Sequence, residues 1–249
     1  AEPGHSAMPG KTTAIGILAQ AISRVEANPL PARLDFLRIV YSALGAAVKP
    51  VYQAAFANSW LFGGLLKRRL SADPTTNASI RTTTAVTMVS GGIKSNLLPA
   101  SAEALVNFRL LPGDSVEDIA EYTRLVINDP RVTVEVDPLD AREASALTSP
   151  SGEAFQSMAT AIRQVYPGAE VAPYLVLGAT DAHHYADLSD QVMRFTPLLT
   201  TRDDMKRMHG INERVHVGKL ARMVQFYMHL FDVWAGGELK PASQPESVD

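Results

Sequence analysis

The stretch IRTTTAVTMV at residues 80–89 and the stretch AEALVNFRLL at residues 102–111 determine the fold that the sequence predicts. Both are rich in β-branched and apolar residues, and they show the alternation of a half-buried β-strand. The residues between them, SGGIKSN at 90–96, contain two adjacent glycines, which favour a turn. The two stretches therefore predict a pair of joined strands.

Two amphipathic segments that flank this pair predict helices. One follows the threonines at 12–13, either of which can act as the N-cap, and stops near Asn28. The other follows the Asp-Ser pair at 114–115 and stops at the Asn-Asp-Pro of 128–130. Val132–Val136 then alternates as a further strand. The order helix, strand, strand, helix, strand is that of a split βαβ unit without its first strand, which we expect just before residue 1.

Residues 32–72 interrupt this unit with an apolar, aromatic-rich insertion at helical spacing. Two interpretations stay open for its aromatic side chains. They can form a satellite core of the first domain, or they can line a pocket for an apolar substrate group.

The second part of the chain alternates helices and strands. A helix with one apolar face runs through 155–165, and a last helix runs through 217–234. Between them, Val171–Leu177 and Val192–Phe195 predict strands. This alternation suits one flank of an α/β sheet. The predicted organisation is a domain at 1–142, a second part at 143–237 and a disordered tail at 238–249, which is rich in Pro, Ser and Glu.

Composition excludes several classes of protein. The 249 residues include 23 basic and 26 acidic ones, so no positive surplus points to nucleic acid. There is no cysteine, which leaves His and carboxylates as metal ligands. The longest uncharged stretch, Pro50–Leu66, is too short and too interrupted by polar residues to span a bilayer.

Three short motifs stand out from this background. They are GHSAMP at 4–9, GATDAHH at 178–184 and KRMHGINER at 206–214. His209 precedes a glycine, so we expect it at a turn, where an imidazole nitrogen can face a cleft. A single histidine is more often a surface or core residue than a ligand, and zinc needs about four donors.

In their order and wording, the three motifs resemble the M20 family of zinc peptidases and amidohydrolases, in particular its carboxypeptidase S and N-fatty-acyl-amino acid hydrolase branch. The resemblance runs from about Gly4 to Trp234. It implies an α/β fold with a ferredoxin-like lid and dimerisation domain, followed by the C-terminal part of a catalytic domain. It also implies zinc-dependent hydrolysis of an amide bond next to a free carboxylate, in peptides or N-acyl amino acids.

The family's first half carries a His-x-Asp motif and a Glu-Glu pair, and neither occurs in this sequence. We therefore expect the chain to open inside the lid domain of a longer protein and to be inactive alone. The complete enzyme is expected to hold two zinc ions, of which this chain supplies one ligand.

The resemblance assigns roles to individual residues. His209 matches the family's final zinc ligand, and His5 matches a lid histidine that donates to the oxyanion, often in the partner subunit's site. Asn96 and Arg109 match lid positions that bind the substrate carboxylate. Gly178, Thr180 and Asp181 are expected to contact substrate, with the backbone amide of Ala179. Relatives commonly have Arg where this chain has His183.

Other interpretations of these residues remain. Glu213 can orient His209 or be an ordinary surface carboxylate. Asp181 can be a loop cap, and Asn96 and Arg109 can serve only the sheet. At the scale of the chain, the alternative is a non-catalytic lid that binds a ligand and assembles, since lids of this family commonly form homodimers.

Overall fold

The computed structural model describes residues 2–178 and 180–235, and these residues form two units. The first comprises the residues up to Arg38 together with Ala54–Ser145. The second comprises Ile39–Gln53 and the described residues from Ala146 onward. Ala179 and the predicted tail at 238–249 lie outside the described residues. The division at 142/143 and the insertion at 32–72 stay predictions as domain boundaries.

The first unit is built on the predicted hairpin. Strands β2 (Thr83–Gly91) and β4 (Ala102–Arg109) pair antiparallel, from Thr83 opposite Arg109 to Gly91 opposite Ala102. A register shift between Val86 and Met88 places one extra residue on β2, as a β-bulge does. Exposure alternates along β4, so every second side chain faces the core.

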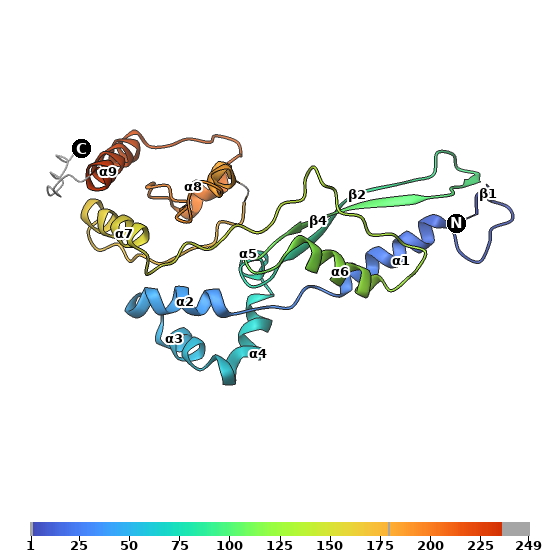
Figure 1. Cartoon of the computed structure of the whole chain (residues 1–249), viewed down its shortest axis with the longest axis horizontal. Coiled ribbons are helices and arrows are strands. Elements are labelled where there is room, and N and C mark those ends of the chain that lie inside the picture. Colours follow the sequence, from blue (N-terminus) through green and yellow to red (C-terminus); the bar gives the residue numbers. More distant parts are fainter. Residues whose placement is uncertain (1, 179, 236–249) are drawn as a thin grey trace. The chain divides into compact units, whose positions relative to one another are not determined.

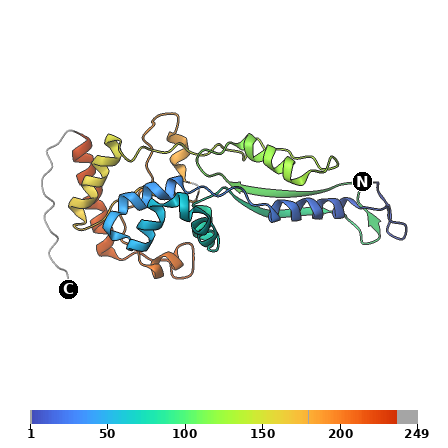
Figure 2. The same ribbon diagram turned by 90° about the horizontal axis from the view of Figure 1, so that it is seen from below.

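Two helices cover one face of this ladder. Helix α1 (Ala14–Ala27) packs against β2, β4 and α6 (Val116–Ile127), as Figure 1 and the view from below in Figure 2 show. The predicted caps are confirmed, because the Thr13 side chain accepts from Gly16 N and the Ser115 side chain accepts from Asp118 N. The helices therefore begin where local chemistry supplies acceptors for their first amides.

The ladder ends in a second, smaller one. Strand β1 (Gly4–His5) pairs antiparallel with β3 (Leu97–Leu98), which lies in the connection between β2 and β4. This pairing brings the first motif of the chain to the tip of the hairpin, as Figure 1 shows.

The strand predicted at Val132–Val136 is wrong. The segment is extended and packs Val132 and Val134 against Ala21, Val25 and Ile127, but it forms no ladder. In a split βαβ unit this strand pairs with the first strand, and no such partner is present among the described residues. The apolar alternation is thus satisfied by packing on the helices.

The insertion is helical, as its spacing predicts. It contains α2 (Asp35–Leu44), the 3₁₀ turn η1 (Gly45–Ala47), α3 (Pro50–Ala57) and α4 (Ser59–Leu70), and the short helix α5 (Pro74–Ala78) follows it. Within it, Phe56 and Leu66 are buried, whereas Trp60 is 82% exposed. Neither interpretation of the aromatic side chains is decided by this packing.

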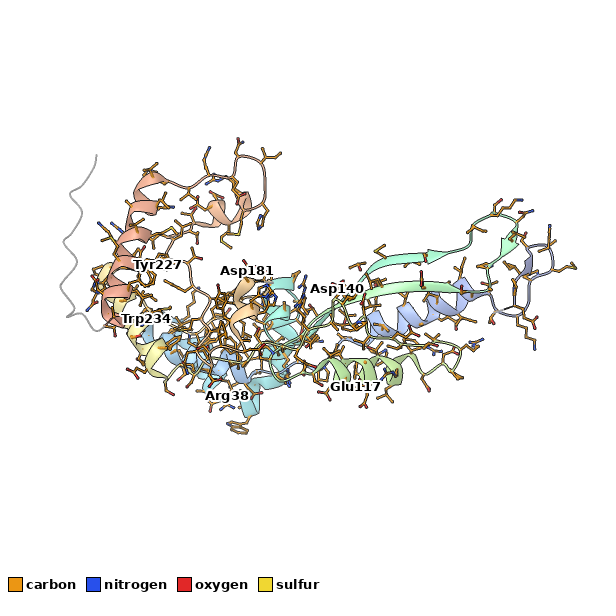
Figure 3. The ribbon with its side chains drawn as sticks, turned by 45° about the horizontal axis from the view of Figure 1, so that its top comes forward. Arg38, Glu117, Asp140, Asp181, Tyr227 and Trp234 are labelled. Carbon is orange, nitrogen blue, oxygen red and sulfur yellow. The ribbon has the colours of Figure 1, made fainter. Side chains whose placement is uncertain are left out.

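The second unit is organised around two helices, α7 (Glu153–Val165) and α9 (Val217–Trp234). Their shared core consists of Ala161, Ile162, Phe226 and Leu230. Figure 3 labels Tyr227 and Trp234 on α9, and the Trp234 indole donates to Ser157 Oγ on α7 at 2.9 Å. The second unit also contains two short elements, η2 (Asp181–Tyr185) and α8 (Arg202–Arg207).

The strands predicted at Val171–Leu177 and Val192–Phe195 are wrong as well. Both segments are extended, but neither forms a ladder with another part of the described chain. Val171 and Phe195 pack on the helix pair instead, whereas Tyr174 is 70% exposed. Across residues 2–178 and 180–235, no helix has the length and apolar character needed to cross a membrane.

Candidate functional site

His5 and Asn96 lie together at the tip of the hairpin. His5 pairs with Leu97 in the short ladder, and Ser6 N donates to Asn96 O at 3.1 Å. The His5 Nδ1 atom accepts from Ala7 N at 3.1 Å, which leaves the Nε2 atom as the N–H donor of the neutral ring. Both side chains are exposed. The structure thus brings the backbone segments that carry His5 and Asn96 side by side.

Arg109 lies at the other end of the same hairpin. It pairs with Thr83, whereas the connection that carries Asn96 leaves the ladder at Gly91 and Ala102. Because each strand residue advances about 3.3 Å, β4 alone separates Ala102 from Arg109 by on the order of 20 Å. Arg109 is exposed on the face of β4 away from Phe108. One lid therefore carries its predicted substrate-binding residues at two separate places.

His209 lies at a turn, as the His-Gly pair predicts. Its φ is 57°, in the left-handed region, and Gly210 N donates to Arg207 O at 2.8 Å to close the turn after α8. The side chain is exposed. The His209 ring forms no hydrogen bond with any described residue, and this includes Glu213.

The described residues contain no cluster of metal-binding side chains. No group of three or more His, Cys, Asp or Glu side chains that could hold a metal ion occurs within residues 2–178 and 180–235. The imidazole of His209 suits zinc by donor type and accessibility, but one donor is far from the usual four. The described residues by themselves therefore do not bring together the donors of a zinc site.

Asp204 fixes the helix that carries the His209 turn. It accepts from Thr201 N at 2.9 Å, from Lys219 Nζ at 3.0 Å and from Arg207 Nη2 at 2.8 Å. The backbone hydrogen bond from Thr201, followed by those from Lys219 and Arg207, holds the pKa of Asp204 well below its usual range. A single carboxylate therefore caps α8 and ties it to α9.

Residues 180–185, which carry most of the GATDAHH motif, form a compact turn. Thr180 has extended backbone before η2, and the His183 Nδ1 atom lies 2.9 Å from Thr180 O. The rings of His183 and His184 are 3.8 Å apart between centroids. Asp181, labelled in Figure 3, is exposed at the start of η2, and Gly178 is exposed before it. Through the described residues, no hydrogen bond or ion pair joins His209 to Thr180 or Asp181.

Arg194 is the residue near this motif that sequence reasoning missed. Its Nε atom donates to Thr180 Oγ1 at 3.0 Å. The two residues are 14 apart and share no periodic pattern. The only local signal was an arginine in an otherwise apolar segment, VMRF at 192–195, which the sequence assigned to a strand.

Comparison with known proteins gives matches along most of the chain. Residues 2–133 match the family model described as a peptidase dimerisation domain. The chain is 38% identical to the probable carboxypeptidase S-like 2 of Dictyostelium discoideum, with 91% of this chain and 44% of that protein aligned. It is 37% identical to an N-fatty-acyl-amino acid synthase/hydrolase of Xenopus tropicalis, with 92% and 45% aligned.

Carboxypeptidase S of Saccharomyces cerevisiae is more distant, at 26% identity with 92% of this chain and 47% of that protein aligned. No solved structure matches. The chain therefore spans less than half the length of these relatives.

Proposed function

The chain belongs to the M20 peptidase family, and we propose that the complete protein is a zinc-dependent hydrolase. Its substrates are peptides or N-acyl amino acids, and it cleaves the amide bond adjacent to a free carboxylate. The observation that carries this proposal is the similarity, over nine tenths of the chain, to a carboxypeptidase S-like protein and an N-fatty-acyl-amino acid synthase/hydrolase.

In this proposal His209 is one ligand of a two-zinc centre, and the remaining ligands belong to the part of the relatives' length that this chain does not span. When bound, zinc activates water and polarises the amide carbonyl. Asp204 holds the His209 turn through α8. Thr180, Asp181 and the backbone of Gly178 are substrate contacts.

The lid residues divide between two sites. A carboxylate is only a few ångströms across, whereas Asn96 and Arg109 of one lid lie at opposite ends of the hairpin. They therefore bind different substrate molecules. In a homodimer formed through the lid, each site takes Arg109 from one subunit and His5 with Asn96 from the other. There, His5 Nε2 donates to the oxyanion that develops on the amide carbonyl, and Arg109 grips the carboxylate.

The exposed apolar side chains of the insertion bear on the choice of substrate. Trp60, Leu61 and Leu65 on α4 are 82%, 60% and 67% exposed. These residues suit a long acyl chain better than a dipeptide. We propose N-acyl amino acids with long acyl chains as the preferred substrates.

A second candidate rests on the family model. The match at residues 2–133 is to a dimerisation domain, so a chain limited to these two units could assemble and bind a ligand without turnover. Metal content separates the two candidates, because assembly alone needs no zinc.

The decisive experiment uses the complete protein and measures bound zinc and the hydrolysis of long-chain and acetyl amino acids. We expect zinc in the wild type and higher kcat/KM for the long acyl chain. The substitution His209→Ala should lower both metal content and activity, by more than about 100-fold for activity, because a direct ligand is lost. Lys206→Gln is the control, since the Lys206 side chain is 77% exposed in the same segment.

Two results would contradict the proposal. Full zinc content and activity in His209→Ala would remove His209 as a ligand. A wild-type protein without zinc or hydrolysis would leave assembly as its function. Equal rates on long and short acyl chains would remove only the argument from the insertion.

A further inference from the structure

The segment that carries Arg194 is fixed on the core of the second unit. The Phe195 ring packs 5.3 Å from the Phe226 ring, between centroids, and Phe226 is fully buried. The Tyr227 hydroxyl on α9 donates to Phe195 O at 3.3 Å. Arg194, which directly precedes Phe195, therefore starts from a backbone anchored to the helix pair.

Two more hydrogen bonds hold the segment on either side. Thr148 Oγ1 donates to Val192 O at 3.0 Å, and the Tyr166 hydroxyl donates to Pro197 O at 2.6 Å. Side chains held from several directions keep a functional group within a fraction of an ångström of its place. Arg194 thus reaches the Gly178–Tyr185 motif from a rigid base, although it lies outside that motif.

The hydrogen bond from Arg194 determines what Thr180 can do. A hydroxyl has one hydrogen to donate and two lone pairs that accept. Arg194 Nε occupies a lone pair of Thr180 Oγ1 at 3.0 Å. The hydroxyl hydrogen must then point away from the guanidinium, so it is directed to another acceptor. The adjacent positive charge strengthens this donor and attracts an anion.

The backbone of Thr180 is held as well. His183 Nδ1 donates to Thr180 O at 2.9 Å, because a carbonyl can only accept. The His183 ring also lies beside the His184 ring, tilted by 39° from it. Arg194 and His183 therefore fix the side chain and the main chain of the same exposed residue.

We propose that Arg194 is a positioning and specificity-determining residue, which orients the Thr180 hydroxyl as a hydrogen-bond donor to the carboxylate of the substrate. This inference rests on the proposed function, since it assigns a determinant for the free carboxylate. Arg194 acts through Thr180, and the net effect is a preference for an anionic over a neutral group at that position.

The test uses the complete enzyme with a matched pair of substrates, an N-acyl amino acid and its C-terminal carboxamide. We expect Arg194→Gln and Thr180→Val each to lower kcat/KM for the carboxylate substrate roughly tenfold, chiefly through KM, because a charge-assisted hydrogen bond is lost. In Arg194→Gln the slower carboxamide reaction should fall much less than the carboxylate reaction. The double variant should have the same kcat/KM as either single variant, since each substitution alone already removes the Arg194–Thr180 hydrogen bond. Thr180→Ser should retain the preference for the carboxylate substrate.

The control is Arg163→Gln, which removes an exposed arginine from α7. An equal fall for both substrates in Arg194→Gln would mean a structural role and would overturn the inference. So would wild-type discrimination in Arg194→Gln. A wild-type enzyme that hydrolyses neither substrate would instead refute the proposed function, and calorimetric binding of the free amino acid product would then test the Arg194–Thr180 pair without turnover.

Discussion

Thr82 shows how one side chain can join three segments of the first unit. It is 1% exposed, the least of the buried polar residues, and its hydroxyl accepts from Leu111 N at 2.7 Å. The same hydroxyl donates to Asp114, which forms an ion pair with Arg33 at 2.9 Å. The start of β2, the exit of β4 and the approach to α6 therefore meet at one hydroxyl.

The substitution Thr82→Val keeps the shape of the side chain but leaves the buried Leu111 N–H without an acceptor. We expect the free energy of unfolding to fall by about 1–3 kcal/mol, the usual cost of an unsatisfied buried donor. Chemical denaturation of wild type and variant measures the difference. Thr87→Val on the exposed side of β2 should change stability by less than about 0.5 kcal/mol. Equal losses of stability in the two variants would show that the hydrogen bonds of Thr82 do not stabilise the fold more than those of an exposed threonine.

At this scale, sequence predicts only what neighbouring residues decide. The turn at His209 follows from the glycine after it and is confirmed by its φ of 57°. The contact between Arg194 and Thr180 depends instead on how Phe195 packs on α9, and no local pattern reports it. The roles of His5, Asn96, Arg109 and His209 stay predictions that the proposed experiments test.

Among the elements, helices were predictable and isolated strands were not. The sequence places α6 correctly, because Ser115 and Asp118 cap one another and Asn128 ends the helix with a φ of 42°. A strand, by contrast, needs a hydrogen-bonding partner. Residues 171–177 alternate like a strand but find none in the described chain. The helical insertion was predicted from spacing alone.

The hydrogen bond between Asp204 on α8 and Lys219 on α9 gives a prediction for the pH dependence of stability. The pKa of Asp204 is lowered in the folded protein, so its hydrogen bonds stabilise the fold fully above its ordinary value of 3.8. This stability is lost as the pH falls below 3.8 and through the lower folded value. Asp204→Asn should therefore reduce the thermal midpoint at pH 6 and flatten its decline between pH 4 and pH 2.

Thermal unfolding across this pH range measures both effects. Asp203→Asn is the matched control, since the neighbouring Asp203 side chain is 74% exposed and pairs only with Lys206 in the described chain. The same acid dependence in wild type and Asp204→Asn would show that the hydrogen bonds of Asp204 contribute nothing to stability. A zinc loss in Asp204→Asn, absent in Asp203→Asn, would further support its hold on the His209 turn.

For the whole molecule, the first unit provides edges suited to assembly. The β2–β4 ladder has two strands within the described residues, so each strand keeps an unpaired edge. On the exposed face, Met88 and Leu105 lie opposite one another, 66% and 49% exposed. Unpaired edges beside apolar side chains favour pairing with a second copy. This agrees with the match to a dimerisation domain.

The proposed dimer makes a prediction that one subunit alone cannot satisfy. His5 and Arg109 lie at opposite ends of the hairpin, so in each site Arg109 comes from one subunit and His5 from its partner. The variants His5→Ala and Arg109→Ala should each be nearly inactive. A mixed dimer of the two then contains one site with both residues intact and one site with neither. After subunits exchange at equal concentration, half of the dimers are mixed, and we expect about a quarter of wild-type activity to return.

Activity measured before and after dissociation and reassembly of the mixed variants decides between arrangements. A double variant carrying both substitutions, mixed with either single variant, is the control and should restore nothing, because no site then regains both side chains. If the single variants also restore nothing while native mass spectrometry shows that mixed dimers form, then His5 and Arg109 serve the same site from one chain. That result would require the hairpin to bend by enough to bring its two ends together, since the paired ladder from Thr83 to Gly91 holds them apart.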